Sequence, residues 1–184
     1  MKEGSDMRDV GLKRLHENQP EDILDNFMLA PGERQALAFC TLGETYAIEL
    51  TSIREIIHST KVTPLRGAPS FISGILSVRG EIIPVIDLEV KFGGPPGEYD
   101  QRSAIVAVEV DSRTIGVRSK AVRGIITFHE DELRAAPVIS TRIRTEFISG
   151  VVNGNEGLVI MLNVDRLLSD EEMASVESAG ESSP

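Results

Sequence analysis

This 184-residue sequence has one cysteine, few aromatic residues and no long apolar run, and each shortage excludes a class of protein. Because Cys40 is the single cysteine, no internal disulfide can form, which fits a reducing cytoplasm. No segment reaches the ~18 consecutive apolar residues of a membrane span, and the polar N-terminus has no apolar signal-peptide core. Cys40 itself lies in a strand-like segment, where an inert, half-buried thiol is favoured over a nucleophile. We therefore expect a cytoplasmic protein without direct membrane insertion.

The acidic charge is concentrated at the two ends of the chain. The net charge is −10, but residues 1–34 carry 8 acidic and 5 basic side chains, and residues 169–184 carry 5 acidic and none basic. Residues 35–168 have 16 acidic and 14 basic side chains and lack the basic stripe that attracts phosphate backbones. Aromatic residues make up 4% of the chain, which leaves few rings on which bases could stack. Nucleic-acid binding is therefore not expected.

The sequence also lacks the residue constellations of an enzyme or a metal site. The three histidines, His16, His58 and His129, are far apart, and none has a second ligand at metal-binding spacing. There is no glycine-rich loop followed by lysine to hold a phosphate, and no Gly-x-Ser-x-Gly nucleophile elbow. We expect no catalytic residue, no cofactor and no metal.

An internal repeat is the most informative pattern in the chain. The matched stretches are Phe71–Ile75 with Phe147–Val151, Ile82–Leu88 with Leu158–Val164 and, more loosely, Leu37–Ile57 with Val106–Ile126. Self-similarity of this kind indicates one structural unit built twice. Positions that agree between the copies predict the framework, and positions that differ in chemistry are candidates for function.

Short segments rich in valine and isoleucine, divided by turn residues, predict strands over residues 37–168. Each copy supplies about five such segments, enough for one small barrel. We expect subdomain 1 at about residues 37–92, a linker rich in glycine and proline at 93–102, and subdomain 2 at about 103–168. A lone barrel of about 60 residues buries little core, so two packed together are favoured. Two segments suit either a buried strand or a helical turn: Ser52–Ile57 and Ala121–Ile126.

The segments outside the repeat carry separate predictions. Residues 1–34 form an N-terminal extension that is predicted to be largely disordered, with a short helix at 20–29. That helix either packs on the body or binds a partner. Ser169–Glu172 has the spacing of a capping box, which predicts a C-terminal helix and an acidic tail within residues 169–184.

Comparison of the copies separates a structural carboxylate from two candidate contact residues. Asp87 ends an apolar segment, but its counterpart Asn163 keeps a capping oxygen and loses the acid. Helix capping is therefore favoured over acid–base chemistry. Arg79 and Glu55 are charged only in the first copy, beside apolar residues. Each is either a solvated surface charge or a polar contact next to a docking patch.

The segment from Phe71 to Leu88 carries a family likeness. It combines a Phe-Ile-x-Gly start, an Arg-Gly hairpin at Arg79 and a Pro-Val-Ile-Asp-Leu strand. In these features it resembles the signature of the CheW family of bacterial chemotaxis coupling proteins, and the resemblance extends from about Gln35 to Leu168. It implies a mostly all-β fold: two SH3-like five-stranded β-barrel subdomains around a shared core, with short helices and a C-terminal helix.

The resemblance also implies a function in two-component signal transduction. Members of the family are non-enzymatic adaptors that couple the cytoplasmic tips of chemoreceptors, the methyl-accepting chemotaxis proteins, to a CheA-type histidine kinase whose regulatory domain has the same fold. The implied location is the cytoplasm, at the inner face of the membrane through receptor arrays, and self-association in array rings stays open. One alternative is an adaptor of a chemosensory pathway with a non-flagellar output, such as surface motility, development or second-messenger signalling. Another is a kinase or response-regulator fragment, which the short sequence after Leu168 disfavours.

By position, the resemblance assigns receptor- and kinase-binding roles to a set of first-copy residues and to one second-copy residue. They are Ile53, Glu55, Ile56, Val78, Arg79, Gly80 and Val122. Val122 matches Ile53 in the repeat and is expected to face the groove between the subdomains. Members of the family often have an acidic residue before this segment, whereas Ser119-Lys120 stands here, which would allow a different partner preference.

Overall fold

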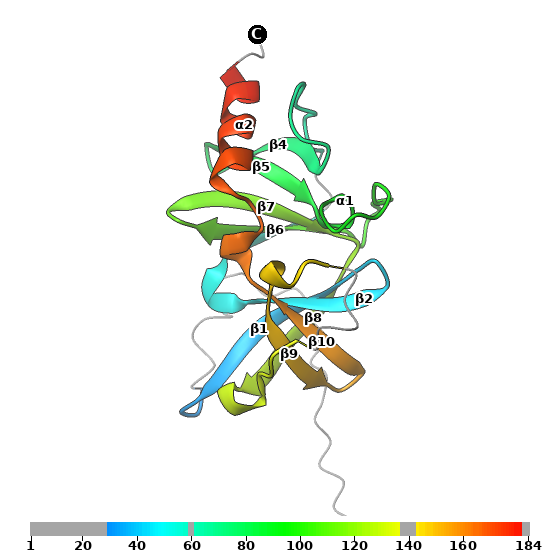
Figure 1. The fold of residues 1–184 in the computed structure, drawn as a ribbon, viewed down its shortest axis with the longest axis vertical. Coiled ribbons are helices and arrows are strands. Elements are labelled where there is room, and N and C mark those ends of the chain that lie inside the picture. The colour runs from blue at the N-terminus through cyan, green and yellow to red at the C-terminus, as the bar shows by residue number, and fades with distance from the viewer. Residues whose placement is uncertain (1–28, 59–60, 137–142, 182–184) are drawn as a thin grey trace, which may run out of the picture.

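The computed structural model describes residues 29–58, 61–136 and 143–181, and in these ranges the chain forms two five-stranded sheets stacked along its long axis (Figure 1). The elements of the first copy are β1 (Glu33–Thr41), β2 (Glu44–Glu49), β3 (Ile53–His58), β4 (Ile72–Val78), β5 (Glu81–Asp87) and α1 (Leu88–Lys91). Those of the second copy are β6 (Ala104–Val110), β7 (Arg113–Ser119), β8 (Ala121–His129), β9 (Ile148–Gly154), β10 (Gly157–Leu162) and α2 (Asp170–Glu181). Short 3-10 helices occupy Leu50–Ser52, Glu130–Glu132, Thr145–Phe147 and Val164–Arg166. The predicted mostly all-β fold with two five-stranded subdomains is confirmed.

Several predicted boundaries can be compared with these elements. β1 begins at Glu33, two residues before the predicted start of the domain. Of the two segments that suited either a strand or a helical turn, the first is strand β3 from Ile53 onward, after a 3-10 helix that ends at Ser52, and the second is the first part of β8. The helix predicted at residues 20–29 lies, apart from its last residue, outside the described residues.

Each sheet combines strands from both copies of the repeat. Sheet A has the order β8-β1-β2-β10-β9, and sheet B has the order β3-β6-β7-β5-β4. The first hairpin of each copy therefore pairs with the last three strands of the other copy. The physical reason is that the chain crosses between sheets directly after each first hairpin, through Leu50–Ser52 in the first copy and Lys120 in the second. The expected division into subdomains at 37–92 and 103–168 is therefore wrong, because each sheet contains strands from both of these ranges.

The apolar residues between the sheets form one central cluster, which the resemblance implied as a shared core. An aromatic row runs through it, with ring centroids 6.4 Å apart for Phe39 and Tyr46, 5.5 Å for Tyr46 and Phe92, and 5.9 Å for Phe92 and Phe147. Phe39 and Tyr46 lie in sheet A, whereas Phe92 follows α1 on the side of sheet B. The row therefore crosses the interface between the sheets and contributes to holding them together.

The repeated Phe-Ile-Ser-Gly motif makes the same backbone contact in both copies. The carbonyl of Phe71 accepts the N–H of Asp87 at 2.8 Å, and the carbonyl of Phe147 accepts the N–H of Asn163 at 2.9 Å. These bonds close the open ends of the β4–β5 and β9–β10 hairpins. The identity of the motif in the two copies thus reflects a shared framework, as predicted.

The glycine of the motif permits the close approach of a passing backbone segment. Thr63 and Ile75 exchange two backbone hydrogen bonds, of 2.9 and 2.8 Å, directly above Gly74. A Cβ atom at Gly74 would overlap the carbonyl oxygen of Thr63, and one at Gly150 would lie 2.8 Å from that of Arg134. Both copies therefore need glycine here for the same steric reason.

Asp87 caps the short helix α1. Its Oδ1 accepts the N–H groups of Glu89 at 2.9 Å and Val90 at 3.3 Å, and its Oδ2 accepts the N–H of Gly97 at 3.2 Å. The predicted structural role of this carboxylate is confirmed. Its counterpart Asn163 makes no side-chain cap bond with the described residues, so the capping ability predicted for it is not used.

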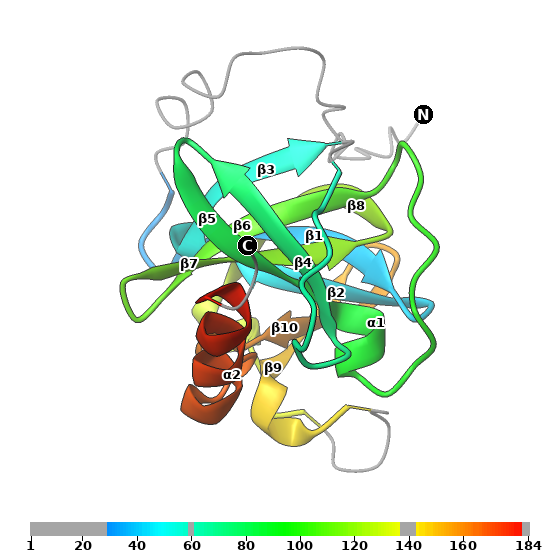
Figure 2. The ribbon, with the colours of Figure 1, turned by 90° about the horizontal axis from the view of Figure 1, so that it is seen from above.

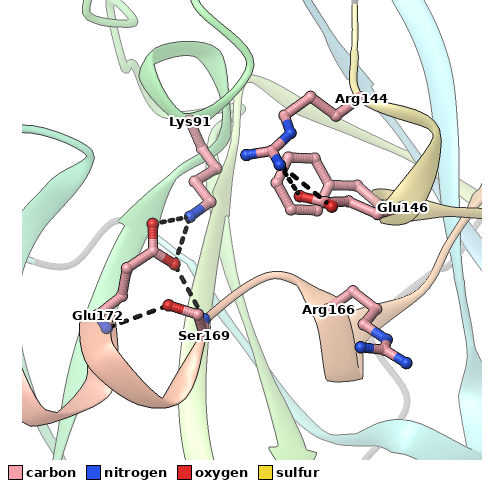
Figure 3. A pocket seen from close by; sticks show the side chains of 7 residues that line it. Lys91, Arg144, Glu146, Arg166, Ser169 and Glu172 are labelled. Atoms are coloured by element: carbon pink, nitrogen blue, oxygen red, sulfur yellow. Dashed lines mark hydrogen bonds and ion pairs between the residues drawn. The ribbon is translucent and has the colours of Figure 1, made fainter.

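A capping box and a buried ion pair hold α2 against the body. Ser169 Oγ accepts the Glu172 N–H at 3.2 Å, and the Glu172 carboxylate accepts the Ser169 N–H at 2.9 Å, which confirms the predicted box. The same carboxylate accepts hydrogen bonds of 2.6 and 2.7 Å from Lys91 Nζ (Figure 3). The Lys91 side chain is only 6% exposed, and its ammonium lies 3.9 Å from the ring centroid of Phe71. The buried face of α2 consists of Met173, Val176 and Ala179.

Replacing Gly74 by alanine is expected to lower the free energy of unfolding by about 3 kcal/mol, because the new methyl group overlaps a backbone oxygen that is fixed in a bridge. Gly67→Ala is the matched control: Gly67 also has a positive φ, of 80°, but no atom lies within 4 Å of its added Cβ. Gly67→Ala is expected to lower the free energy of unfolding by about 1 kcal/mol. Chemical denaturation measures both values. Equal costs would show that backbone conformation, and not close approach, accounts for the glycine.

The ion pair at α2 predicts a pH-dependent stability. Burial raises the pKa of Glu172, but hydrogen bonds from Lys91 and Ser169 outweigh burial and hold that pKa below its usual value. The stabilisation is therefore present above the unfolded-state pKa of about 4.3 and is lost as the pH falls through the folded value. Glu172→Gln should lower the free energy of unfolding by about 2 kcal/mol at neutral pH and by much less near pH ~3.

Thermal unfolding of the parent and of Glu172→Gln across this pH range measures the difference. Glu171→Gln, at the exposed neighbouring position, is the matched control and should behave like the parent. A difference for Glu172→Gln that stays constant with pH would contradict the assigned ion pair.

Candidate functional site

Three of the predicted site residues pack against the core between the sheets. Ile53 and Ile56 lie on β3, and Val122 lies on β8, and these strands are edges of sheets B and A respectively. All three side chains are half-buried and pack against the same central cluster. Figure 2 shows β3 and β8 on the side of the molecule away from α2. We call the surface formed by β3 and β8 the edge-strand surface.

A β-bulge interrupts each of these two strands at an arginine. In β3 the register against β6 passes from Ile53 to Glu55, so that Arg54 is the extra residue. In β8 the equivalent extra residue, opposite β1, is Arg123. Bulges bend a strand and redirect its side chains, and they are frequent beside functional sites. Because the two arginines occupy matching positions in the repeat, both halves of the edge-strand surface have the same local shape.

The two residues that are charged only in the first copy form an ion pair. Arg79 Nε donates to Glu55 Oε2 at 3.0 Å. Glu55 lies on β3 and Arg79 lies in the β4–β5 turn, so the pair joins the two edges of sheet B. Arg79 and Gly80 have φ values of 49° and 86°, the positive values that a two-residue hairpin turn requires. The Arg79 side chain is 80% exposed, and the turn therefore presents it to solvent at a defined position.

Sheet A carries an equivalent ion pair with the charges reversed. Nη1 of Arg123 on β8 lies 2.9 Å from Oε2 of Glu156 in the β9–β10 turn. The strands β8 and β9 are the two edges of that sheet. A position-by-position comparison of the copies missed this pair. Arg123 lies one residue before the position that matches Glu55, and Glu156 lies one residue after the position that matches Arg79. A search for opposite charges at neighbouring offsets would have found it.

Two exposed aliphatic residues, which the sequence had not singled out, lie close to these turns. Ile82 is 68% exposed and Leu158 is 48% exposed. They are the second residues of β5 and β10 and correspond to each other in the repeat. The predicted residue Val78 is half-buried and packs against a separate cluster of sheet B. Each sheet thus ends in an aliphatic side chain near an ion pair, a mixture typical of protein interfaces.

The described residues contain no group of three or more His, Cys, Asp or Glu that could hold a metal ion. A pocket of about 260 Å³ beside α2 contains the ion pairs Lys91–Glu172 and Arg144–Glu146, whereas Arg166 points away from the first pair (Figure 3). Over the described ranges, no helix is long and apolar enough to cross a membrane.

Comparison with known proteins places this fold in a family. The family model of the CheW-like domain matches residues 35–172. Chemotaxis protein CheW of Klebsiella aerogenes is 32% identical over 149 residues, which covers 80% of this chain and 90% of that protein. Protein FrzA of Myxococcus xanthus is 27% identical over 127 residues, which covers 68% of this chain and 79% of that protein.

A solved structure agrees with these sequence relatives. The scaffolding protein TtCheW from Thermoanaerobacter tengcongensis matches this chain with a TM-score of 0.70 at 27% identity, covering 76% of this chain and 94% of that one. The signature from Phe71 to Leu88, the two five-stranded sheets and the relatives point to the same family. The chain belongs to the CheW-like family of scaffold proteins of chemotaxis signalling.

Proposed function

We propose that this protein is a non-enzymatic adaptor that couples the cytoplasmic tips of chemoreceptors to a CheA-type histidine kinase in two-component signal transduction. It acts in the cytoplasm, beneath the membrane that holds the receptors. Membership of the CheW-like family supports a scaffold role in chemotaxis signalling. The receptor tip and the regulatory domain of the kinase are the partners that the family resemblance implies.

The edge-strand surface is the observation that carries this proposal. Its side chains Ile53, Ile56 and Val122 are half-buried against the core that the two sheets share. An apolar strip of this kind suits the apolar face of a partner helix. A helix bound there would contact strands of both sheets at once, so that its position would affect the whole protein.

The end of sheet B offers a second contact surface for the kinase. Ile82 is 68% exposed there, close to the turn that presents Arg79, which Glu55 holds in place. An adaptor needs two separate surfaces, because it binds both partners together. The reversed ion pair at the end of sheet A, Arg123–Glu156, also suits end-to-end contact between copies of this chain in array rings.

A second candidate function is that of an adaptor in a chemosensory pathway with a non-flagellar output. The similarity to protein FrzA of Myxococcus xanthus, at 27% identity, favours it. The two candidates share the same binding surfaces and differ in the cognate receptor and kinase.

Reconstitution tests the proposal. The purified protein is mixed with a receptor signalling fragment and the kinase encoded in the same genome, and both complex formation and kinase autophosphorylation are followed. We expect a ternary complex and a change in autophosphorylation that requires all three components. Absence of both would rule out the coupling function.

Arg79→Ala and Glu55→Ala are expected to weaken complex formation at least about tenfold, because each removes one partner of the pair that presents the arginine. The free energy of unfolding should change by less than about 1 kcal/mol, since the pair is solvent-accessible. Arg102→Ala is the matched control: Arg102 also forms an exposed ion pair, with Asp100, but lies in the linker. A large loss of stability in either variant would show instead that the pair is structural.

A further inference from the structure

A single residue, Lys120, carries the chain from sheet B to sheet A. β7 ends at Ser119 in sheet B, and β8 begins at Ala121 in sheet A. The equivalent crossover in the first copy uses the three residues Leu50–Ser52. The place of Lys120, two residues before Val122 on the edge-strand surface, therefore determines where β8 starts.

Lys120 is held by a carboxylate that reaches it from α1. Its Nζ lies 3.1 Å from Oε1 of Glu89, and the Glu89 side chain is 2% exposed, whereas that of Lys120 is 45% exposed. The same oxygen accepts the N–H of Leu42 at 3.1 Å, in the β1–β2 turn of sheet A. Because α1 directly follows β5 of sheet B, Glu89 ties that sheet to sheet A at two points.

The burial of Glu89 restricts where the ammonium group of Lys120 can lie. A nearly fully buried carboxylate requires compensation, which the ammonium of Lys120 and the N–H of Leu42 supply. The cation is therefore confined to one place. An exposed pair such as Arg113–Glu177, with both side chains more than half exposed at 55% and 58%, carries no such requirement.

At the equivalent position in the other half, the described residues form no such tie. By the repeat, Glu89 and Lys120 correspond to Asp165 and Thr51. Both of these residues are exposed, and neither side chain forms a hydrogen bond or ion pair with another residue of the described ranges. Within the described ranges, the start of β8 therefore has an ion pair to a buried carboxylate, and the start of β3 has no equivalent.

We propose that Glu89 and Lys120 are a positioning pair, which fixes the start of β8 against sheet B and thereby sets the shape of the edge-strand surface for a partner helix. This inference rests on the proposed function, because it names residues that prepare the same surface. The family resemblance connects Lys120 with a different partner preference, because family members often have an acidic residue before this segment. In this proposal Lys120 acts through Glu89 and does not touch the partner.

Four variants separate positioning from direct contact and from simple stabilisation. Glu89→Gln keeps an oxygen for the Leu42 N–H but removes the charge, and Lys120→Met removes the cation. The double variant leaves no unpaired charge, and Lys120→Arg keeps the cation. Arg113→Met, which breaks an exposed ion pair elsewhere, is the control. Three quantities are measured: the Kd for a chemoreceptor signalling-tip fragment, the Tm, and the exchange rates by NMR of the amides of residues 121–123.

Glu89→Gln and the double variant are expected to weaken binding at least about fivefold. Amide exchange at the start of β8 should accelerate at least about tenfold, with exchange in β10 unchanged. The double variant should regain the thermal stability that Lys120→Met loses, but not the affinity. Lys120→Arg and the control should bind like the parent.

Two results would overturn the proposal. If Glu89→Gln binds like the parent while Lys120→Met does not, Lys120 touches the partner directly. If the affinity of the double variant returns together with its stability, the pair is only structural. A parent protein that fails to bind the fragment contradicts the proposed function instead, and the exchange rates of the variants then decide alone whether the pair fixes β8.

Discussion

The parallel pairing of β2 with β10, and of β5 with β7, is the contact on which the rest of this structure depends. Each pair joins the first hairpin of one copy to the last strand of the other, and neither five-stranded sheet is complete without it. Parallel strands cannot be joined by a tight turn, so these contacts link segments that are distant in sequence. The two sheets and the core between them are therefore expected to form together, as one cooperative unit.

This exchange of strands also determines where function can lie. It places β3 and β8, the third strands of the two copies, at the edges of different sheets and against the same central cluster. The short helix α1 stands beside the junction, and its two buried charges point in different directions. Glu89 binds Lys120 at the crossover between the sheets, whereas Lys91 binds Glu172 on α2. Four residues of helix thus connect both sheets with the C-terminal helix.

Local contacts explain how much the sequence could reveal. The closing hydrogen bond of the Phe-Ile-Ser-Gly motif and the cap at Asp87 depend on residues in or next to one hairpin, so the repeat predicted a shared framework and a structural carboxylate there. The exchange of hairpins was not predictable, because both arrangements use the same turns and bury the same apolar residues. Glu55 and Arg79 were recognised as separate charges, but their pairing across the edges of sheet B depends on the closure of that sheet. The same holds for Lys120, whose buried partner is fixed by tertiary structure alone.

We propose that the edge-strand surface receives a helical partner from a chemoreceptor. An NMR titration of the isotope-labelled protein with a receptor signalling-tip fragment would test this binding, because backbone amides report on each strand separately. We expect the largest chemical-shift changes on β3 and β8, around Ile53, Ile56 and Val122. Changes confined to α2 and the pocket beside Lys91, with β3 and β8 unaffected, would contradict it.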